Sequence, residues 1–200
     1  MKWIAPTLTY LAVAVGLFGF QSAWGALVGF HLAILLSLLI AKPNLSIRIL
    51  FRGRNLKWIL VSILLCASSG LTLYFFWDKL GIAEDVSARV GALGLNTSNW
   101  IAFIAYFTLV NPLLEEYFWR GYLGSVNPTP HISDVLYSGF HGLILINKVQ
   151  PGVIVCCLTV LMLAGWFWRQ LARTNGGLLA PLLGHMIADL TILVAIFLKV

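Results

Sequence analysis

The sequence predicts an all-α protein, a polytopic transmembrane bundle of about seven helices (six to eight), and three observations support this class. Of the 200 residues, 60% are apolar and 10% are charged, whereas a water-facing surface needs about a quarter charged residues. Several apolar runs reach the ~20 residues with which a helix crosses a bilayer. Lys and Arg gather in the loops between these runs, which is the positive-inside pattern of membrane proteins.

The apolar runs place the helices in order. The uncharged stretch from Trp3 to Ala41 is too long for one span, so it predicts a hairpin of two helices that turns near residues 20–24. A basic loop then leads into the third span. We expect this span and the four that follow at residues 58–77, 100–120, 132–147, 153–168 and 178–198.

The basic loop gives the strongest signal of orientation. It holds Lys42, Arg48, Arg52, Arg54 and Lys57, and such loops face the cytoplasm. Because the basic residues lie between apolar runs and not over a folded surface, the net charge of +6 does not indicate nucleic-acid binding. We expect an integral membrane protein of a bacterial plasma membrane, with the lipid bilayer in contact with its helices.

Ionisable side chains inside the predicted spans are candidates for a functional site, because burying them in a membrane is costly unless they face a partner or a polar cavity. Glu116 and Arg120 are four residues apart, so they can pair on one face of a helix. Glu115 is then left unpaired and free to exchange a proton, as a general base must. The full set is Glu115, Glu116, Arg120, His141, His185, Asp189 and the isolated His31.

Position along the helices brings these groups together. His185 and Asp189 are four apart, so the carboxylate could hold the imidazole, or both could bind a metal. Glu115, His141 and His185 fall at similar depths below the cytoplasmic helix ends, which predicts a shared, water-filled cavity open to the cytoplasm. His31 has no polar neighbour at helical spacing and is interpreted as a packing or interfacial residue. Trp168, beside Arg169, fits an interfacial aromatic belt.

Three motifs resemble those of the CPBP family, the CAAX-protease and bacteriocin-processing membrane proteins, also called the Abi or type II CAAX prenyl endopeptidase family. Glu115, Glu116 and Arg120 are similar to its Glu-Glu-x-x-x-Arg motif. Tyr137 to His141 resembles Phe-x-x-x-His with an aromatic exchange, and His185 to Asp189 resembles His-x-x-x-Asn/Asp. The resemblance implies a single membrane domain, residues 1–200, in which 100–200 form the catalytic core and 1–99 add accessory helices.

The resemblance also implies an intramembrane endopeptidase that hydrolyses a peptide bond of a membrane-associated peptide or protein tail. Glu115 and His141 would activate the water, and His185 with Asp189 would stabilise the oxyanion. An ionised Asp189 cannot donate a hydrogen bond, so it is protonated, orients His185, or shares the site with a cation.

The metal is left open by the sequence. Glu115, His141, His185 and Asp189 could bind zinc, yet the His-Glu-x-x-His signature of zinc proteases is absent from the sequence. The family has been described both as metalloproteases and as glutamate-dependent proteases. Our interpretation favours a glutamate-activated water without a metal, and no cofactor is otherwise implied.

Two other functions compete. The fold could serve a non-proteolytic membrane scaffold or a bacteriocin-immunity protein, in which Glu115→Ala would leave the phenotype unchanged. A transporter could use buried Glu and His side chains as a proton relay, but no inverted repeat relates the two halves of the sequence.

Overall fold

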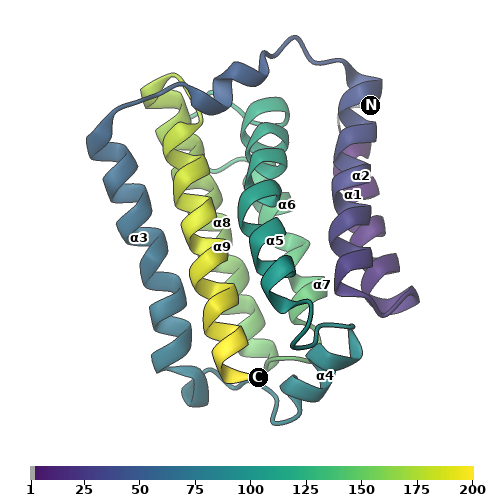
Figure 1. Cartoon of the computed structure of the whole chain (residues 1–200). Coiled ribbons are helices and arrows are strands. Elements are labelled where there is room, and N and C mark those ends of the chain that lie inside the picture. Colours follow the sequence, from purple (N-terminus) through teal and green to yellow (C-terminus); the bar gives the residue numbers. More distant parts are fainter. Residues whose placement is uncertain (1–2) are drawn as a thin grey trace.

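The computed structural model describes residues 3–200, and it confirms the all-helical class. The chain opens with the predicted hairpin: α1 (Ile4–Ala14) continues into a π-helical turn, η1 (Val15–Gly19), and α2 (Ala23–Ala41) runs back beside it (Figure 1). A Cβ atom at Gly16 would overlap the backbone of Ala26. Glycine at this position therefore lets the two helices of the hairpin come into backbone contact.

Within residues 3–200, four helices are long and apolar enough to cross a membrane: α2, α3 (Leu56–Phe75), α8 (Pro151–Asn175) and α9 (Leu179–Lys199). Shorter apolar segments lie between them, and α5 (Trp100–Glu115) is one of these. The seven predicted segments all occur as helices in the predicted order, although three of them are shorter or interrupted. The protein is an integral membrane protein by this architecture.

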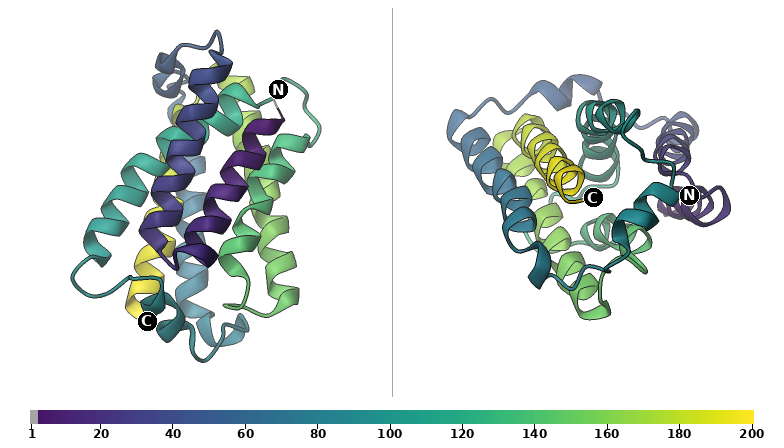
Figure 2. Two further views of the ribbon diagram at one scale, coloured as in Figure 1. Left: turned by 90° about the vertical axis from the view of Figure 1, so that its right-hand side faces the viewer. Right: turned by 60° about the horizontal axis from the view of Figure 1, so that its bottom comes forward.

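The helices form one bundle around α9. Both α3 and α5 pack along α9, α8 lies behind it, and α6 (Ile132–Gly139) packs against α8. The α1–α2 hairpin packs on α5, at the opposite edge of the bundle from α3 (Figures 1 and 2). The short helix α4 (Val86–Ala92) closes one end. One cluster of buried apolar side chains joins residues of the hairpin to residues of the later helices.

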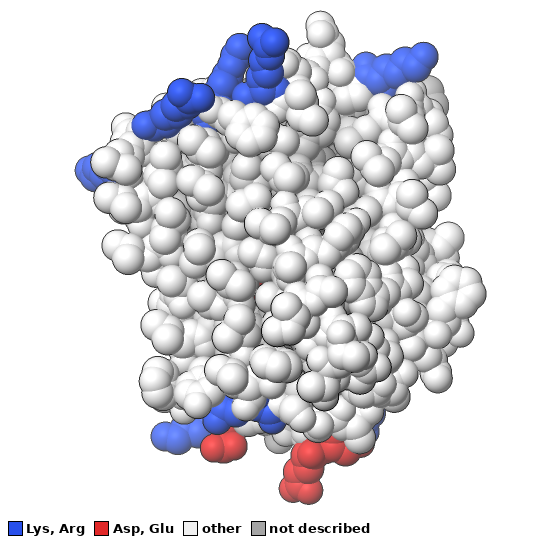
Figure 3. All heavy atoms as spheres, in the orientation of Figure 1, with Lys and Arg blue, Asp and Glu red and all other residues white. Residues whose placement is uncertain are grey.

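Charged side chains lie at the two ends of the bundle, and the broad band between them is uncharged on the face drawn in Figure 3. The basic loop forms one end and includes a short 3-10 helix, η2 (Ile47–Phe51). It is fixed to the start of α9 because the backbone N–H of Leu178 donates to the carbonyl of Ile49 at 2.9 Å. Such a charge distribution matches a protein embedded in lipid.

The predicted fifth and sixth spans differ from the structure in continuity and in length. The segment expected at 132–147 is divided into α6 and α7 (His141–Leu145), with a break at Phe140. The sixth span extends to Asn175, beyond the predicted end at residue 168, so Arg169 lies within α8 and not in a loop. The predicted end lies too early because an arginine usually marks the edge of the apolar region.

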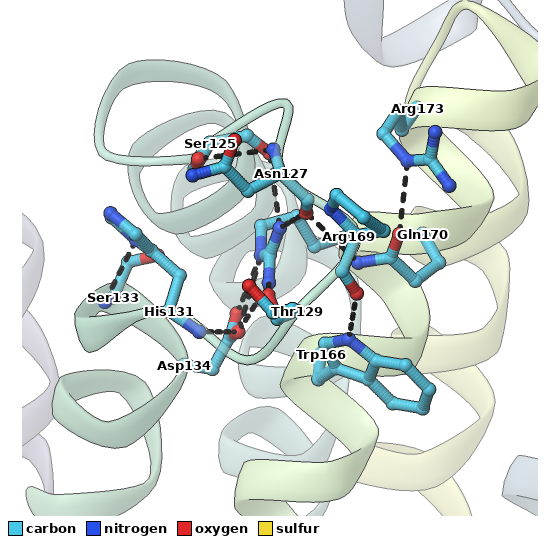
Figure 4. A network of polar contacts seen from close by, with 11 residues as sticks. Ser125, Asn127, Thr129, His131, Ser133, Asp134, Trp166, Arg169, Gln170 and Arg173 are labelled. Atoms are coloured by element: carbon cyan, nitrogen blue, oxygen red, sulfur yellow. Dashed lines mark hydrogen bonds and ion pairs between the residues drawn. The ribbon is translucent and has the colours of Figure 1, made fainter.

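Arg169 is buried and binds the loop that precedes α6 (Figure 4). Its guanidinium forms an ion pair with Asp134 at 2.8 Å and donates to the backbone carbonyls of Ser125, Asn127 and Thr129. Asp134 in turn accepts from the backbone N–H of His131 and caps α6. The burial of this charge is tolerated because acceptors surround it.

The α3–α9 contact depends on two small residues, Gly184 and Ser62. A Cβ atom at Gly184 would overlap Oγ of Ser62 and would lie 3.2 Å from Nε1 of Trp168. We therefore expect Gly184→Ala to lower the free energy of unfolding by about 1–3 kcal/mol, the usual cost of overpacking. Unfolding in detergent would measure this loss.

Two further variants test the cause of that loss. Ser62→Ala removes the overlapping oxygen, so it should restore part of the stability of Gly184→Ala. At Gly152 an added Cβ meets no atom within 4 Å, and Gly152→Ala is the matched control. Equal losses for the alanines at positions 184 and 152 would contradict the packing explanation.

Candidate active site

The helix that carries the glutamates changes its geometry at the site. Pro112 lies within α5 and has no backbone N–H to donate, and the π-helix η4 (Glu116–Tyr122) begins directly after Glu115. A π-helix is wider than an α-helix, and such turns often occur at functional sites. The sequence predicted one continuous helix here, so the π turn is a feature that spacing alone did not indicate.

Glu116 is the central acceptor of the cluster. Its Oε1 lies 3.1 Å from Nη1 of Arg120 and 2.8 Å from Nδ1 of His185, and all three side chains are buried. The ion pair with Arg120 is the one that the four-residue spacing predicts. The contact with His185 joins η4 to α9, so Glu116 holds two functional side chains and not one.

Glu115 is buried and is held on one side only. Its Oε1 accepts a hydrogen bond from the amide of Asn111 at 2.9 Å. The same amide lies 3.2 Å from Oδ2 of Asp189. Within residues 3–200, Oε2 of Glu115 accepts no hydrogen bond. One oxygen of this carboxylate is thus fixed by the protein, and the other has no protein donor.

His185 lies between two carboxylates. In addition to Glu116, Asp189 approaches it, with Oδ1 3.6 Å from Nε2. At that distance the i, i+4 pair makes no direct hydrogen bond, so Glu116 holds the imidazole more firmly than Asp189 does. The indole of Trp168 stacks on the ring, with centroids 4.8 Å apart. Trp168 is therefore a wall of the site, and its interpretation as part of an aromatic belt is wrong.

His141 begins α7 and is oriented by its own backbone. Its Nδ1 lies 3.1 Å from the carbonyl oxygen of Tyr137. A carbonyl only accepts, so Nδ1 carries the proton and Nε2 is left with a lone pair. Within the described chain no hydrogen bond joins His141 to Glu115.

Tyr137 connects His141 with the rest of the cluster. Its ring centroid lies 5.4 Å from that of His141 and 6.1 Å from that of His185. The guanidinium of Arg120 stacks over the same ring at 3.8 Å, within the range of a cation–π interaction. The aromatic position of the second motif thus packs against the residues of the first and third motifs.

Zinc does not fit the residues as they are arranged. Within residues 3–200, no group of three His, Cys, Asp or Glu side chains could hold a metal ion. The amide N–H groups of Asn111 point toward Oε1 of Glu115 and Oδ2 of Asp189, so one oxygen of each carboxylate already has a donor. We therefore derive no step of the chemistry through a metal.

The cluster lies in a segment with known relatives. Residues 97–191 match a family model described as type II CAAX prenyl endopeptidase Rce1-like. This segment is similar to the Rce1-like family. All of the motif residues from Glu115 to Asp189 fall within this Rce1-like segment, and the match confirms the resemblance to the type II CAAX prenyl endopeptidase family. No curated protein and no solved structure matches the chain.

Two residues of the cluster carried no role in the sequence prediction. Asn111 precedes Glu115 by four residues, a spacing that could have indicated the contact. His31 was interpreted as a packing or interfacial residue, but its Nε2 lies 3.1 Å from Oδ1 of Asn111 and its Nδ1 3.1 Å from the hydroxyl of Tyr106. Its polar partners lie on another helix, so helical spacing within α2 could not reveal them.

Proposed function

We propose that the protein is an intramembrane endopeptidase that hydrolyses a peptide bond in a membrane-associated peptide or protein tail, with water as the nucleophile. The observation that carries this proposal is the state of Glu115. Its carboxylate is buried, one oxygen is fixed by Asn111, and the other has no hydrogen-bond donor in the described chain. A carboxylate held in this way is suited to take a proton from a water molecule.

The chemistry assigned to the site proceeds in two stages. Glu115 takes one proton from a water molecule whose other O–H donates to the Nε2 lone pair of His141. The water oxygen bonds to the carbonyl carbon of the substrate, and the carbonyl oxygen becomes negative. The C–N bond then breaks, and the proton passes to the departing amine. No covalent bond to the protein is needed, so the products are a new carboxylate and a new amine.

The remaining charged groups stabilise the negative oxygen that forms in the first stage. His185 donates from Nδ1 to Glu116. When the ring also carries a proton on Nε2, beside Asp189, this second N–H is a donor that a preorganised site can offer to an oxyanion. Asp189 accepts from Asn111 and so keeps α9 in place beside α5. Arg120 balances the charge of Glu116.

The Rce1-like description suggests the class of substrate, a C-terminal tail that ends in a prenylated CAAX sequence. Cleavage of leader peptides is the alternative within the same chemistry. We place the opening of the site on the side of the basic loop, which is the cytoplasmic side by the positive-inside pattern. The rival function is a scaffold or immunity protein that retains the fold, and it requires no hydrolysis.

The test is hydrolysis by the purified protein in lipid vesicles. Peptides with a prenylated C-terminal cysteine motif and the same peptides without the lipid are incubated with the protein, and products are identified by mass spectrometry. We expect cleavage at one bond, with the lipidated peptide preferred. If the protein cleaves neither of the two CAAX peptides and also fails to cleave a leader-type peptide, the scaffold function is favoured.

A further inference from the structure

The second helix of the N-terminal hairpin places a histidine against the active site. His31 lies on α2, outside the Rce1-like segment 97–191, and it is 3% exposed. Its ring contacts Asn111 through Nε2 and Tyr106 through Nδ1. Asn111 then reaches Glu115 and Asp189. A chain of hydrogen bonds therefore runs from the hairpin to the carboxylate that is proposed to activate water.

The direction of each bond in this chain follows from the chemistry of the groups. The Nδ2 amino group of Asn111 faces two carboxylate oxygens, and the reversed amide would oppose its carbonyl oxygen to both of them. Oδ1 of Asn111 therefore faces His31, and because it can only accept, Nε2 of His31 must donate. Nδ1 is then the acceptor for the Tyr106 hydroxyl.

The hairpin is fixed to the catalytic helices by more than this one contact. The hydroxyl of Tyr10, on α1, donates to the carbonyl of Leu136 at 2.7 Å. Phe30, next to His31, packs on Phe140 with ring centroids 4.9 Å apart. The hairpin thus contacts both α5 and α6, and His31 is held where it meets Asn111.

We infer that His31 is a positioning residue of the active site, acting through Asn111 to fix the orientation of the Glu115 carboxylate. This inference rests on the proposed function. Hydrogen bonds arranged in a chain strengthen one another in a medium of low dielectric constant. Because the bond to His31 fixes the orientation of the Asn111 amide, its N–H donates to Oε1 of Glu115. The N-terminal hairpin is then part of the catalytic apparatus and not only an accessory.

The first test separates positioning from simple packing. His31→Leu removes the hydrogen-bond donor and puts an apolar side chain in its place. We expect kcat to fall by about 10–100-fold with KM changed less than about 3-fold, because a displaced general base slows chemistry more than binding. His31→Gln offers an amide N–H near the place of Nε2–H and should restore most of kcat. The matched control is Ser37→Ala, since Ser37 is a buried residue of α2 whose hydroxyl bonds only within that helix.

Coupling to Asn111 provides the second test. In an Asn111→Leu background, His31→Leu should cause no further loss of kcat, because the relay is already broken. An unchanged kcat in folded His31→Leu, no recovery with glutamine, or additive losses in the double variant would each overturn the inference. If the unaltered protein cleaves no peptide, the proposed function itself fails. If Glu115→Gln keeps the unaltered rate, the assignment of Glu115 as the base fails, and both results differ from a His31 variant with full activity.

A third measurement does not depend on activity. Long-range proton–nitrogen correlation spectra of protein labelled with ¹⁵N-histidine report which ring nitrogen of His31 carries the proton. The Nε2–H form is expected, with a change of its signals in Asn111→Leu. A proton on Nδ1 alone would contradict the direction of the hydrogen-bond chain, whatever the kinetics.

Discussion

Replacing Glu115 by glutamine is expected to lower kcat by roughly 10²–10⁴-fold, the range in which general acid–base catalysis contributes. Glutamine has nearly the same shape, and its amide oxygen can still accept from Asn111, so the fold should be retained. The side chain can no longer take a proton from water. Initial rates of peptide hydrolysis in vesicles measure the loss, and thermal unfolding in detergent shows whether the variant is folded.

The control for this variant is Glu84→Gln, which makes the same chemical change at an exposed position. Its kcat should equal that of the unaltered protein. Hydrolysis by Glu115→Gln at the unaltered rate, with a normal unfolding temperature, would rule out the proposed base. In that case the protein would still be an endopeptidase, and a group other than Glu115 would take the proton from water.

Replacing Arg169 by glutamine is expected to lower the free energy of unfolding by about 3–5 kcal/mol, as when one partner of a buried ion pair is removed. The change leaves the buried carboxylate of Asp134 without its cation. It also removes the donors for the carbonyls of Ser125, Asn127 and Thr129. Unfolding by SDS in mixed micelles gives the free-energy difference.

The same helix offers the matched comparison. Arg173 lies one turn further along α8, is exposed, and donates only to the side chain of Gln170. Arg173→Gln should therefore change the stability by less than about 0.5 kcal/mol. Similar losses for the two arginine variants would show that charge at this end of the bundle matters, and not the network around Asp134.

Much of the fold could be predicted because the bilayer fixes the length and apolarity of its helices. The hairpin, the third span and the last span lie within a few residues of their expected positions. The end of α8 could not be predicted, because an arginine usually marks the end of a membrane-spanning helix. Only the structure shows that Arg169 is buried against its partner Asp134. The π turn after Glu115 leaves no periodic pattern in an apolar helix.

The site was predictable where its contacts repeat at helical spacing. Glu116 and Arg120 pair as expected, since residues four apart share one helix face. The bond from Glu116 to His185 and the stacking of Trp168 on that histidine join separate helices, for which one sequence contains no spacing rule. Similarly, His31 could not be linked to Asn111, because 80 residues separate them.

The π turn makes the site sensitive to the length of the chain as well as to its side chains. Because η4 places more residues in each turn than an α-helix does, deleting one residue between Glu116 and Tyr122 would let this segment return to regular α-helical winding. A deletion between Glu116 and Arg120 would bring these two residues from four positions apart to three, whereas a deletion after Arg120 would leave their spacing unchanged. A one-residue gap before Arg120 should therefore be more damaging than a gap after it, although both can keep every motif residue.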